Sequence, residues 1–174
     1  MKEKLPKRRE CIDLLKKAGC DENVINHCQA VEDLALRIAE LTDANKELVR
    51  IAALLHDIGR GSTHGIRHAV EGAKIARELG LPESVVLIIE RHIGAGLTKD
   101  EAKRWGLPPK DYVPNTLEEK IVAHADNLID ENEKRPVREV AQRFEDFGYG
   151  YVAEKVLALH KELSEICGMD LDLI

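Results

Sequence analysis

The doublet His56-Asp57, followed by Ile58-Gly59, limits the possible folds of this chain more than any other feature. A histidine beside an aspartate offers a metal ion one neutral nitrogen and one anionic oxygen, and the carboxylate can also bridge two ions. Each buried imidazole needs a polar partner, and a shared metal centre satisfies several of them together. We therefore expect a fold that brings distant helices to one metal-binding point. Six of the seven histidines lie in the first three quarters of the chain, at His27, His56, His64, His68, His92 and His124.

The length and composition are typical of one globular domain with a highly charged surface. The chain has 174 residues, of which 44% are hydrophobic and 33% are charged, enough to bury a continuous core. The formal net charge of −6 argues against a nucleic-acid backbone as the main partner, because no basic excess is available to neutralise phosphates. With one Trp, three Tyr and two Phe, the aromatic content also argues against a base-stacking platform.

The cysteines and the N-terminal segment predict a reduced, cytoplasmic protein. The four cysteines form no CxxC pair, so reduced thiols are expected rather than a disulfide framework. The segment from Met1 to Glu10 is basic and polar, and no apolar stretch behind it resembles a secretory signal. No apolar run approaches membrane-spanning length. The cysteines are Cys11, Cys20, Cys28 and Cys167.

Apolar residues recur at helical spacing almost throughout, and strand signals are negligible, so the sequence predicts an all-α fold. Thr98 with Glu101 and Thr116 with Glu119 form two capping boxes that mark helix starts. The segment Leu107–Asn115 carries three prolines and is predicted to be a loop or lid. The predicted helices lie between Pro6 and Gly19, from Asp21 to about Leu41, from Thr42-Asp43 to Ile58, from His68 to Gly80, from Val85 to Ile93, from Thr98 to about Gly106, from Thr116 to Ile129, from Val137 to Phe147 and from Tyr151 to Cys167.

We expect a single domain over residues 1–174, with a metal-binding core at 21–132 and a C-terminal helical extension at 136–168. A charged break from Asp130 to Arg135, followed by Pro136, separates the two parts. The two helices of the extension bring only His160, which is expected on a solvated or packing face. The extension is therefore predicted to be structural.

The spacing of the candidate ligands requires a helix end at the doublet. His56 and Asp57 are about 100° apart on a helix, so both reach one centre only where the helix stops. Gly59 can supply a helix-terminating conformation. His27 comes from the preceding helix and Asp126 from a much later one, as in sites built within helix bundles. Imidazole and carboxylate ligands suit iron, manganese, zinc, cobalt or nickel, and the set is too rich in nitrogen for calcium.

These residues resemble the HD-domain superfamily of metal-dependent phosphohydrolases, in its HDIG form. The resemblance covers about Asn26 to Asp130. The first histidine of the family matches His27, the HD doublet matches His56-Asp57, and the final aspartate matches Asp126 in Ala125-Asp126-Asn127-Leu128. The resemblance implies an HD-domain helical bundle, here with two extra C-terminal helices.

A subset of this superfamily carries two more histidines and binds two metals. One occurs in a His-Ala-x-x-Gly-Ala segment, which residues 68–73 reproduce, and the other precedes a glycine, as His92 does in Arg91-His92-Ile93-Gly94. The arrangement is similar to that of bacterial dinucleoside-tetraphosphate hydrolases and archaeal HDIG phosphodiesterases. It implies that Asp57 bridges two divalent ions. The implied metal ligands are His27, His56, Asp57, His68, His92 and Asp126.

Three further residues have two interpretations each. The resemblance suggests that Arg60 contacts substrate phosphate, but an arginine near a helix end can also be a surface residue favoured by the helix dipole. His64 is a candidate general acid or phosphate contact, or a solvated loop histidine. His124 lies about 200° around the helix from Asp126, so a packing or supporting role is expected. The candidate catalytic residues are Asp57, Arg60 and His64.

The resulting hypothesis is a phosphohydrolase that cleaves a phosphomonoester or phosphodiester, with a metal-activated hydroxide as nucleophile. Resemblance alone favours a nucleotide-like substrate. One alternative is a mixed-valence di-iron oxygenase with the same six ligands, and another is a metal-stabilised regulatory or binding domain. The expected partners are a small-molecule phosphate ester and, as an open alternative, a second copy of the chain. No nucleic-acid polymer and no membrane are expected. Trp105 and Tyr112, in the segment Gly94–Asn115, could stack on a base or could be packing residues.

Overall fold

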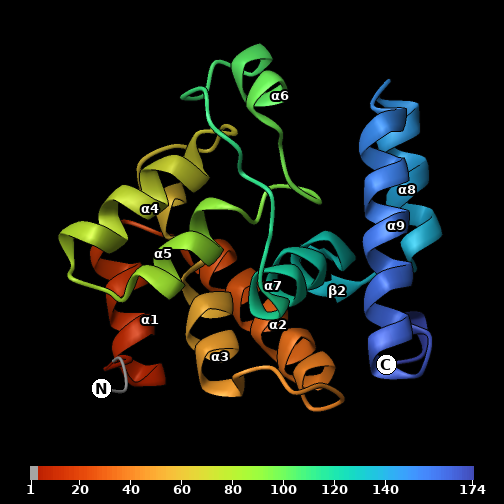
Figure 1. Cartoon of the computed structure of the whole chain (residues 1–174). Helices are drawn as coiled ribbons and strands as arrows, with labels where there is room; N and C mark the ends of the chain where they lie inside the picture. Colours follow the sequence, from red (N-terminus) through yellow and green to blue (C-terminus); the bar gives the residue numbers. More distant parts are fainter. Residues whose placement is uncertain (1–3) are drawn as a thin grey trace.

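The computed structural model describes residues 4–174, and within this range the chain is almost entirely helical (Figure 1). The first three residues of the basic N-terminal segment lie outside the described range. The helices are α1 Arg8–Lys17, α2 Glu22–Ala39, α3 Lys46–Leu55, α4 His68–Glu78, α5 Glu83–Glu90, α6 Lys99–Arg104, α7 Leu117–Leu128, α8 Val137–Asp146 and α9 Gly150–Cys167, with short 3₁₀ turns η1 Ile58–Gly61 and η2 Leu171–Leu173.

The expected all-α fold is confirmed, and several helix starts have the predicted caps. The Asp21 side chain accepts a hydrogen bond from the Val24 amide at 3.0 Å, at the start of α2. Thr98 and Glu101 form a complete capping box at α6. Such side chains satisfy amides that have no partner inside the helix. The local sequence therefore sets where these helices begin.

Three details differ from the prediction. Helix α3 was expected to start at Thr42-Asp43 but begins at Lys46, where the Asn45 side chain accepts a hydrogen bond from the Leu48 amide at 3.2 Å. A small antiparallel hairpin, β1 Ile129–Asp130 with β2 Glu133–Lys134, follows α7, and Glu131 in its turn has a positive φ of 54°. Strands of two residues are too short to give an alternating pattern. Helix α5 was expected to reach Ile93 but ends at Glu90, so His92 lies just beyond the helix.

Helices α2, α3, α5 and α7 form the centre of the fold. Helix α3 packs against α2, α5 and α7, and α4 covers α5 and η1. Helix α3 is almost wholly buried from Ile51 to Leu55, because neighbours surround it on nearly every side. This central position places the end of α3, and the doublet after it, deep inside the protein.

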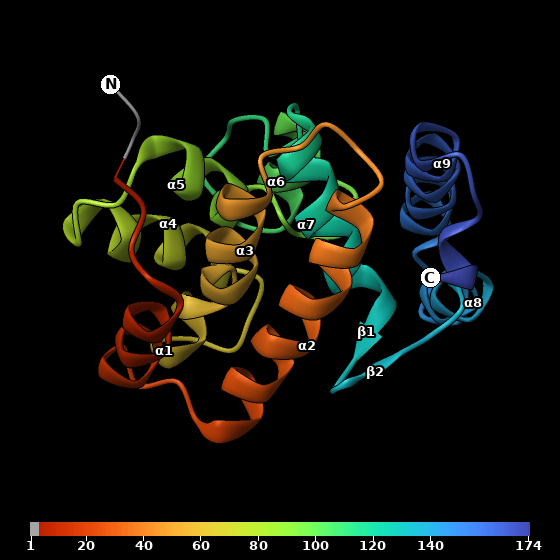
Figure 2. The same ribbon diagram turned by 90° about the horizontal axis from the view of Figure 1, so that it is seen from below.

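Helices α8 and α9 pack against each other, and α9 also packs on α7 (Figure 2). After α9 the chain turns at Gly168, which has a φ of 72°, and η2 packs back onto α9. The Lys134 ammonium donates to the carbonyls of Leu171 and Ile174, at 2.7 Å each. The hairpin and the C-terminal turn are therefore directly connected.

All four cysteines of the chain are free thiols, in agreement with the predicted absence of a disulfide framework.

In the range 4–174, none of the helices combines the length and the apolar character needed to cross a membrane.

Candidate metal centre

The His56-Asp57 doublet lies where α3 ends. Helix α3 stops at Leu55, and Asp57 leaves the helical conformation with φ −99° and ψ 15° before η1 begins. Both side chains are buried, with exposed fractions of 0% and 2%. The change of backbone direction lets two consecutive side chains face one centre, as the spacing predicted.

Gly59 is required here for a reason other than the predicted one. It does not terminate the helix with a positive φ. A Cβ at this position would collide with the His68 carbonyl and would lie 2.6 Å from the Gly72 amide nitrogen. The absence of a side chain therefore lets η1 lie directly against the first turn of α4, which carries His68.

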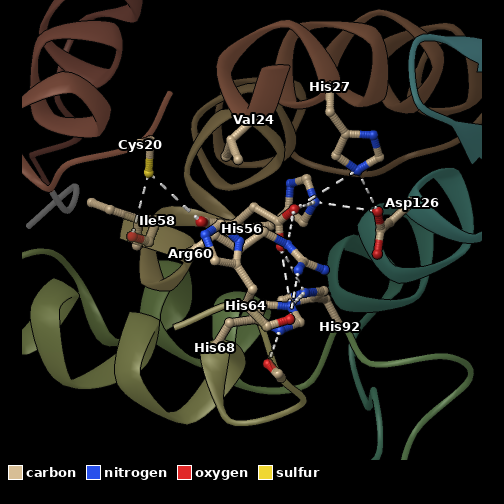
Figure 3. Close-up of polar contacts among 12 residues, drawn as sticks. Cys20, Val24, His27, His56, Ile58, Arg60, His64, His68, His92 and Asp126 are labelled. Atoms are coloured by element: carbon tan, nitrogen blue, oxygen red, sulfur yellow. Dashed lines mark hydrogen bonds and ion pairs between the residues drawn. The ribbon is translucent and has the colours of Figure 1, made fainter. Parts of the chain in front are cut away.

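The structure brings all six predicted ligands together (Figure 3). Their donor atoms form three overlapping groups in which all atoms lie within 4.8 Å of one another. The groups are His27, His56 and Asp57; His56, His92 and Asp126; and Asp57, His68 and His92.

The two oxygens of Asp57 face different histidines. Oδ1 lies 3.1 Å from His68 Nε2 and 3.5 Å from His92 Nε2. Oδ2 lies 3.6 Å from His56 Nε2 and 3.9 Å from His27 Nε2. This carboxylate therefore lies between two pairs of imidazoles.

Asp126 lies on the His27 and His56 side of Asp57. Its Oδ1 is 2.8 Å from His27 Nε2 and 3.3 Å from His56 Nε2. Helix α7 supplies this carboxylate, and its contacts with α2 and α3 hold it opposite their two histidines.

Each of the four imidazoles turns its other nitrogen, Nδ1, toward a backbone carbonyl. A carbonyl accepts, so Nδ1 carries the proton, and in the neutral ring Nε2 then has a lone pair directed at the centre. Metal-binding histidines are commonly held in this way. The pairs are His27 with Glu131 at 2.8 Å, His56 with Ala53 at 2.6 Å, His68 with Gly65 at 2.8 Å and His92 with Ile89 at 2.6 Å.

Charges in the centre shift the pKa values of its members. Burial raises the pKa of the Asp57 carboxyl, but the facing His56, His68 and His92 outweigh it and hold that pKa well below the usual range. Burial lowers the pKa of His56, but Asp57 and Asp126 raise it further, well above the ordinary value. Burial dominates at His92 and lowers its pKa.

The unpaired atoms of the centre fit a cation. His56 Nε2 and Asp57 Oδ1 are buried, and neither has a hydrogen-bond partner among the described residues. Buried polar atoms normally have partners, and these two are an imidazole nitrogen and a carboxylate oxygen on the two different sides of Asp57. Divalent ions coordinated by imidazoles and carboxylates on each side would satisfy them.

Arg60 and His64 lie at the open side of the centre. Arg60 Nε donates to Asp57 Oδ2 at 2.7 Å, and its NH1 donates to the His64 carbonyl at 3.2 Å. Their side chains line a surface cavity of about 330 Å³ together with His27, Asp57 and residues at the start of α2. His64 itself is exposed. The arginine therefore contacts the carboxylate of a predicted ligand directly, which the sequence did not indicate.

His124 lies outside the centre, as expected. It is fully buried, and its Nε2 lies 2.9 Å from His160 Nδ1, while His160 Nε2 lies 3.0 Å from Asp170 Oδ1. Sequence reasoning missed this chain of contacts. The signal that could have revealed it is Gly168, which ends α9 and turns the chain back along the helix.

The two candidate stacking residues differ in their surroundings. Tyr112 is buried, and its hydroxyl donates to the Pro108 carbonyl at 3.0 Å, so it is a packing residue. Trp105 is 36% exposed, and its ring lies 5.4 Å from that of Tyr149, measured between centroids.

Comparison with known proteins finds relatives that match most of this chain. The chain is 46% identical over 170 residues to a tRNA (cytidine(56)-2'-O)-methyltransferase of Thermoplasma volcanium, covering 98% of this chain and 50% of that protein. This chain thus spans about half the length of that relative. It is 51% identical over 155 residues to an uncharacterised protein of Methanocaldococcus jannaschii, covering 84% of this chain and 91% of that one.

A solved structure shares the fold. The HD domain of the L. monocytogenes phosphodiesterase PgpH superposes with a TM-score of 0.59 at 17% identity, over 94% of this chain and 96% of that one. The sequence model of the HD domain matches residues 24–130, more than half of the chain and the segment that holds all six clustered ligands. The chain therefore belongs to the HD domain family.

Proposed function

We propose that this protein is a metal-dependent phosphohydrolase that cleaves a phosphomonoester or phosphodiester of a nucleotide or nucleotide-like small molecule. The observation that carries the proposal is Asp57, whose two oxygens face two separate pairs of imidazoles. One carboxylate between two sets of nitrogen ligands suits two divalent ions that act on one phosphoryl group.

The proposed ligands divide between two positions that share Asp57. His27, His56 and Asp126 would hold one ion, and His68 and His92 would hold the other. The donor set suits iron or manganese, and also zinc, cobalt or nickel. When bound, such ions supply Lewis acidity toward phosphoryl oxygens and an activated water.

The proposed roles of Arg60 and His64 follow from their places beside the cavity. Arg60 steadies the Asp57 carboxylate through the 2.7 Å contact, and its guanidinium also faces the cavity where a phosphate would lie. A cation there binds phosphate and gains strength as charge develops in the transition state. His64 stands at the rim, where it could contact the leaving group or donate a proton to it.

The similarity to tRNA methyltransferases concerns about half of their length. We propose that the half represented here contributes phosphoester hydrolysis, because its buried polar centre consists of imidazoles and carboxylates arranged as metal ligands. RNA-derived phosphate esters are therefore candidate substrates, in addition to free nucleotides.

The test is a substrate screen under anaerobic conditions. The full chain is freed of metal, reloaded with Mn²⁺ or Fe²⁺, and given phosphomonoesters, cyclic nucleotides, dinucleoside polyphosphates and short RNAs with terminal phosphates. We expect hydrolysis of at least one class without oxygen, and none by Asp57→Ala. Turnover that requires oxygen would instead assign an oxygenase. Metal binding without turnover in any arm would point to a regulatory domain.

A further inference from the structure

A second cavity, of about 220 Å³, lies among the loop after α5, the end of α6 and the junction of α8 with α9. Four aromatic residues line it, although the whole chain has only one Trp, three Tyr and two Phe. They come from three separate segments of the chain. We call this cavity the aromatic pocket; its aromatic residues are Trp105, Phe144, Tyr149 and Tyr151.

The aromatic side chains of this pocket are partly exposed to solvent. Trp105 and Tyr149 meet at an interplanar angle of 52°, and Trp105 and Tyr151 are 36% and 40% exposed. The Lys155 ammonium lies 5.9 Å from the Tyr151 ring centroid and is paired with Glu101 at 2.6 Å. Large aromatic side chains normally bury most of their surface, so this partial exposure around a cavity leaves stacking surface available.

Some residues that line the aromatic pocket are close neighbours, along the chain, of residues in the metal centre. Ile66 precedes the ligand His68 by two residues, and Ile93 directly follows the ligand His92. The pocket also includes Gly94, whose carbonyl accepts from the Asn127 side chain at 2.9 Å; Asn127 follows the ligand Asp126. The pocket therefore shares with the metal centre the two chain segments that carry His68 and His92.

The chemistry of the pocket favours recognition of a ring by its face. Several backbone groups of the walls are already engaged: the Ile93 carbonyl accepts from the Gly96 amide at 3.0 Å, and Leu97 exchanges two hydrogen bonds with Tyr112. These backbone groups are therefore not available to the edge of a bound ring. The volume is also below the roughly 300–1,000 Å³ of drug-sized ligand sites, which suits one ring system rather than two.

We propose that the aromatic pocket binds a single nucleobase by stacking, with little discrimination among bases. This inference rests on the proposed function, because it assigns the substrate of the same centre to the base-bearing phosphate esters. Every base has an aromatic face, so stacking tolerates differences between bases. Affinity should then follow ring size, with purines binding more tightly than pyrimidines.

The single tryptophan provides a direct measurement, since Trp105 is in the pocket and all tryptophan fluorescence comes from it. Adenosine and cytidine, which carry no phosphate, are titrated into the metal-loaded full chain, with ribose 5-phosphate as the ligand without a base. We expect saturable quenching by both nucleosides, stronger binding of adenosine, and no quenching by ribose 5-phosphate. Absence of saturable quenching by adenosine would overturn the proposal.

A matched pair of variants separates the pocket from its surroundings. Tyr149→Leu should weaken adenosine binding by roughly five- to 150-fold, the range expected for loss of one stacking partner. Phe147→Leu is the control, because Phe147 is 77% exposed on the neighbouring turn and does not line the pocket. If Tyr149→Leu does not fold, Tyr151→Leu replaces it. Equal adenosine affinities in the pocket variant and the control would reject the assignment.

The two proposals can fail separately. Phosphoesterase activity without nucleoside binding would reject the aromatic pocket as a base site and leave the hydrolase intact. Nucleoside binding that Tyr149→Leu weakens would support the pocket even if no phosphate ester were cleaved. In an active enzyme, Tyr149→Leu should raise the KM for nucleotides, whereas the control Phe147→Leu should leave it unchanged.

Discussion

His68 Nε2 and His92 Nε2 lie only 3.0 Å apart, while the Nδ1 atoms of both rings face backbone carbonyls. In the neutral tautomer that these carbonyls favour, two lone pairs point at one small space. Either one ring gains a proton, or a cation lies where both can bind it. Asp57 Oδ1 lies 3.1 Å from His68 Nε2, so two imidazoles and one carboxylate form a donor set that suits a cation.

We predict two transition-metal ions per chain after anaerobic loading, measured by elemental analysis. His92→Ala should reduce this to about one, because His27, His56 and Asp126 keep their arrangement around Asp57. His64→Ala is the control and should retain two, since His64 is exposed. One ion at most in the saturated wild-type protein would eliminate the binuclear model.

Asp57→Ala should abolish phosphoesterase activity and weaken both metal positions, since this carboxylate faces both pairs of imidazoles. Circular dichroism of the variant should show that the helices remain.

His124→Ala should behave differently, because His124 contacts His160 and lies outside the three groups of candidate ligands. We expect unchanged metal content there and a loss of about 1–3 kcal/mol in the free energy of unfolding, as for other broken buried hydrogen bonds. Metal loss in His124→Ala combined with full metal in His92→Ala would contradict our ligand assignment.

Arg60→Ala should lower kcat/KM by about ten- to 150-fold, the range for loss of a charge-assisted hydrogen bond, while metal remains bound. Arg60→Lys should restore only part of this, because a lysine cannot reproduce a guanidinium that contacts both Asp57 and the His64 carbonyl. Steady-state kinetics and metal analysis on the same preparations check this. Wild-type kinetics in Arg60→Ala would mean that this arginine has no part in catalysis.

His64→Gln tests whether the rim histidine donates a proton to the leaving group. A general acid must carry its proton, so its contribution falls as the pH rises. The variant should therefore have a flatter alkaline limb in its pH–rate profile. A profile that matches the wild type would assign proton donation to water instead.

The buried His124 should make stability depend on pH. Burial lowers the pKa of His124 to about 3, whereas an unfolded histidine titrates near an ordinary pKa of about 6.5. Between these values the unfolded state binds the additional proton, so stability decreases as the pH falls below about 6.5. Urea unfolding of metal-free protein at pH 7.5 and 5.0 should show a larger loss in the wild type than in His124→Gln. The difference is limited to about 1.4 kcal/mol per pH unit, and equal losses would show that His124 does not titrate in this way.

Local signals in the sequence predicted most of the fold, and the resemblance to the HD-domain superfamily supplied the six residues that the structure clusters. Asp21 and the Thr98–Glu101 box marked helix starts because capping depends only on nearby residues. Contacts set by tertiary packing were not predictable. The carbonyl that holds His27 belongs to Glu131, more than a hundred residues away, and the Arg60 contact with Asp57 depends on the path of η1. Gly59 was singled out correctly, but its role is the close approach to α4.

The hairpin after α7 has a consequence for any shortened form of this protein. The HD match ends at residue 130, and the next residue, Glu131, supplies the carbonyl that orients the His27 imidazole. A chain cut at that boundary would keep every clustered ligand and lose the support of one of them. In such a fragment the His27 imidazole would be loosely oriented. The smallest fragment that keeps the whole centre in place therefore includes the hairpin turn.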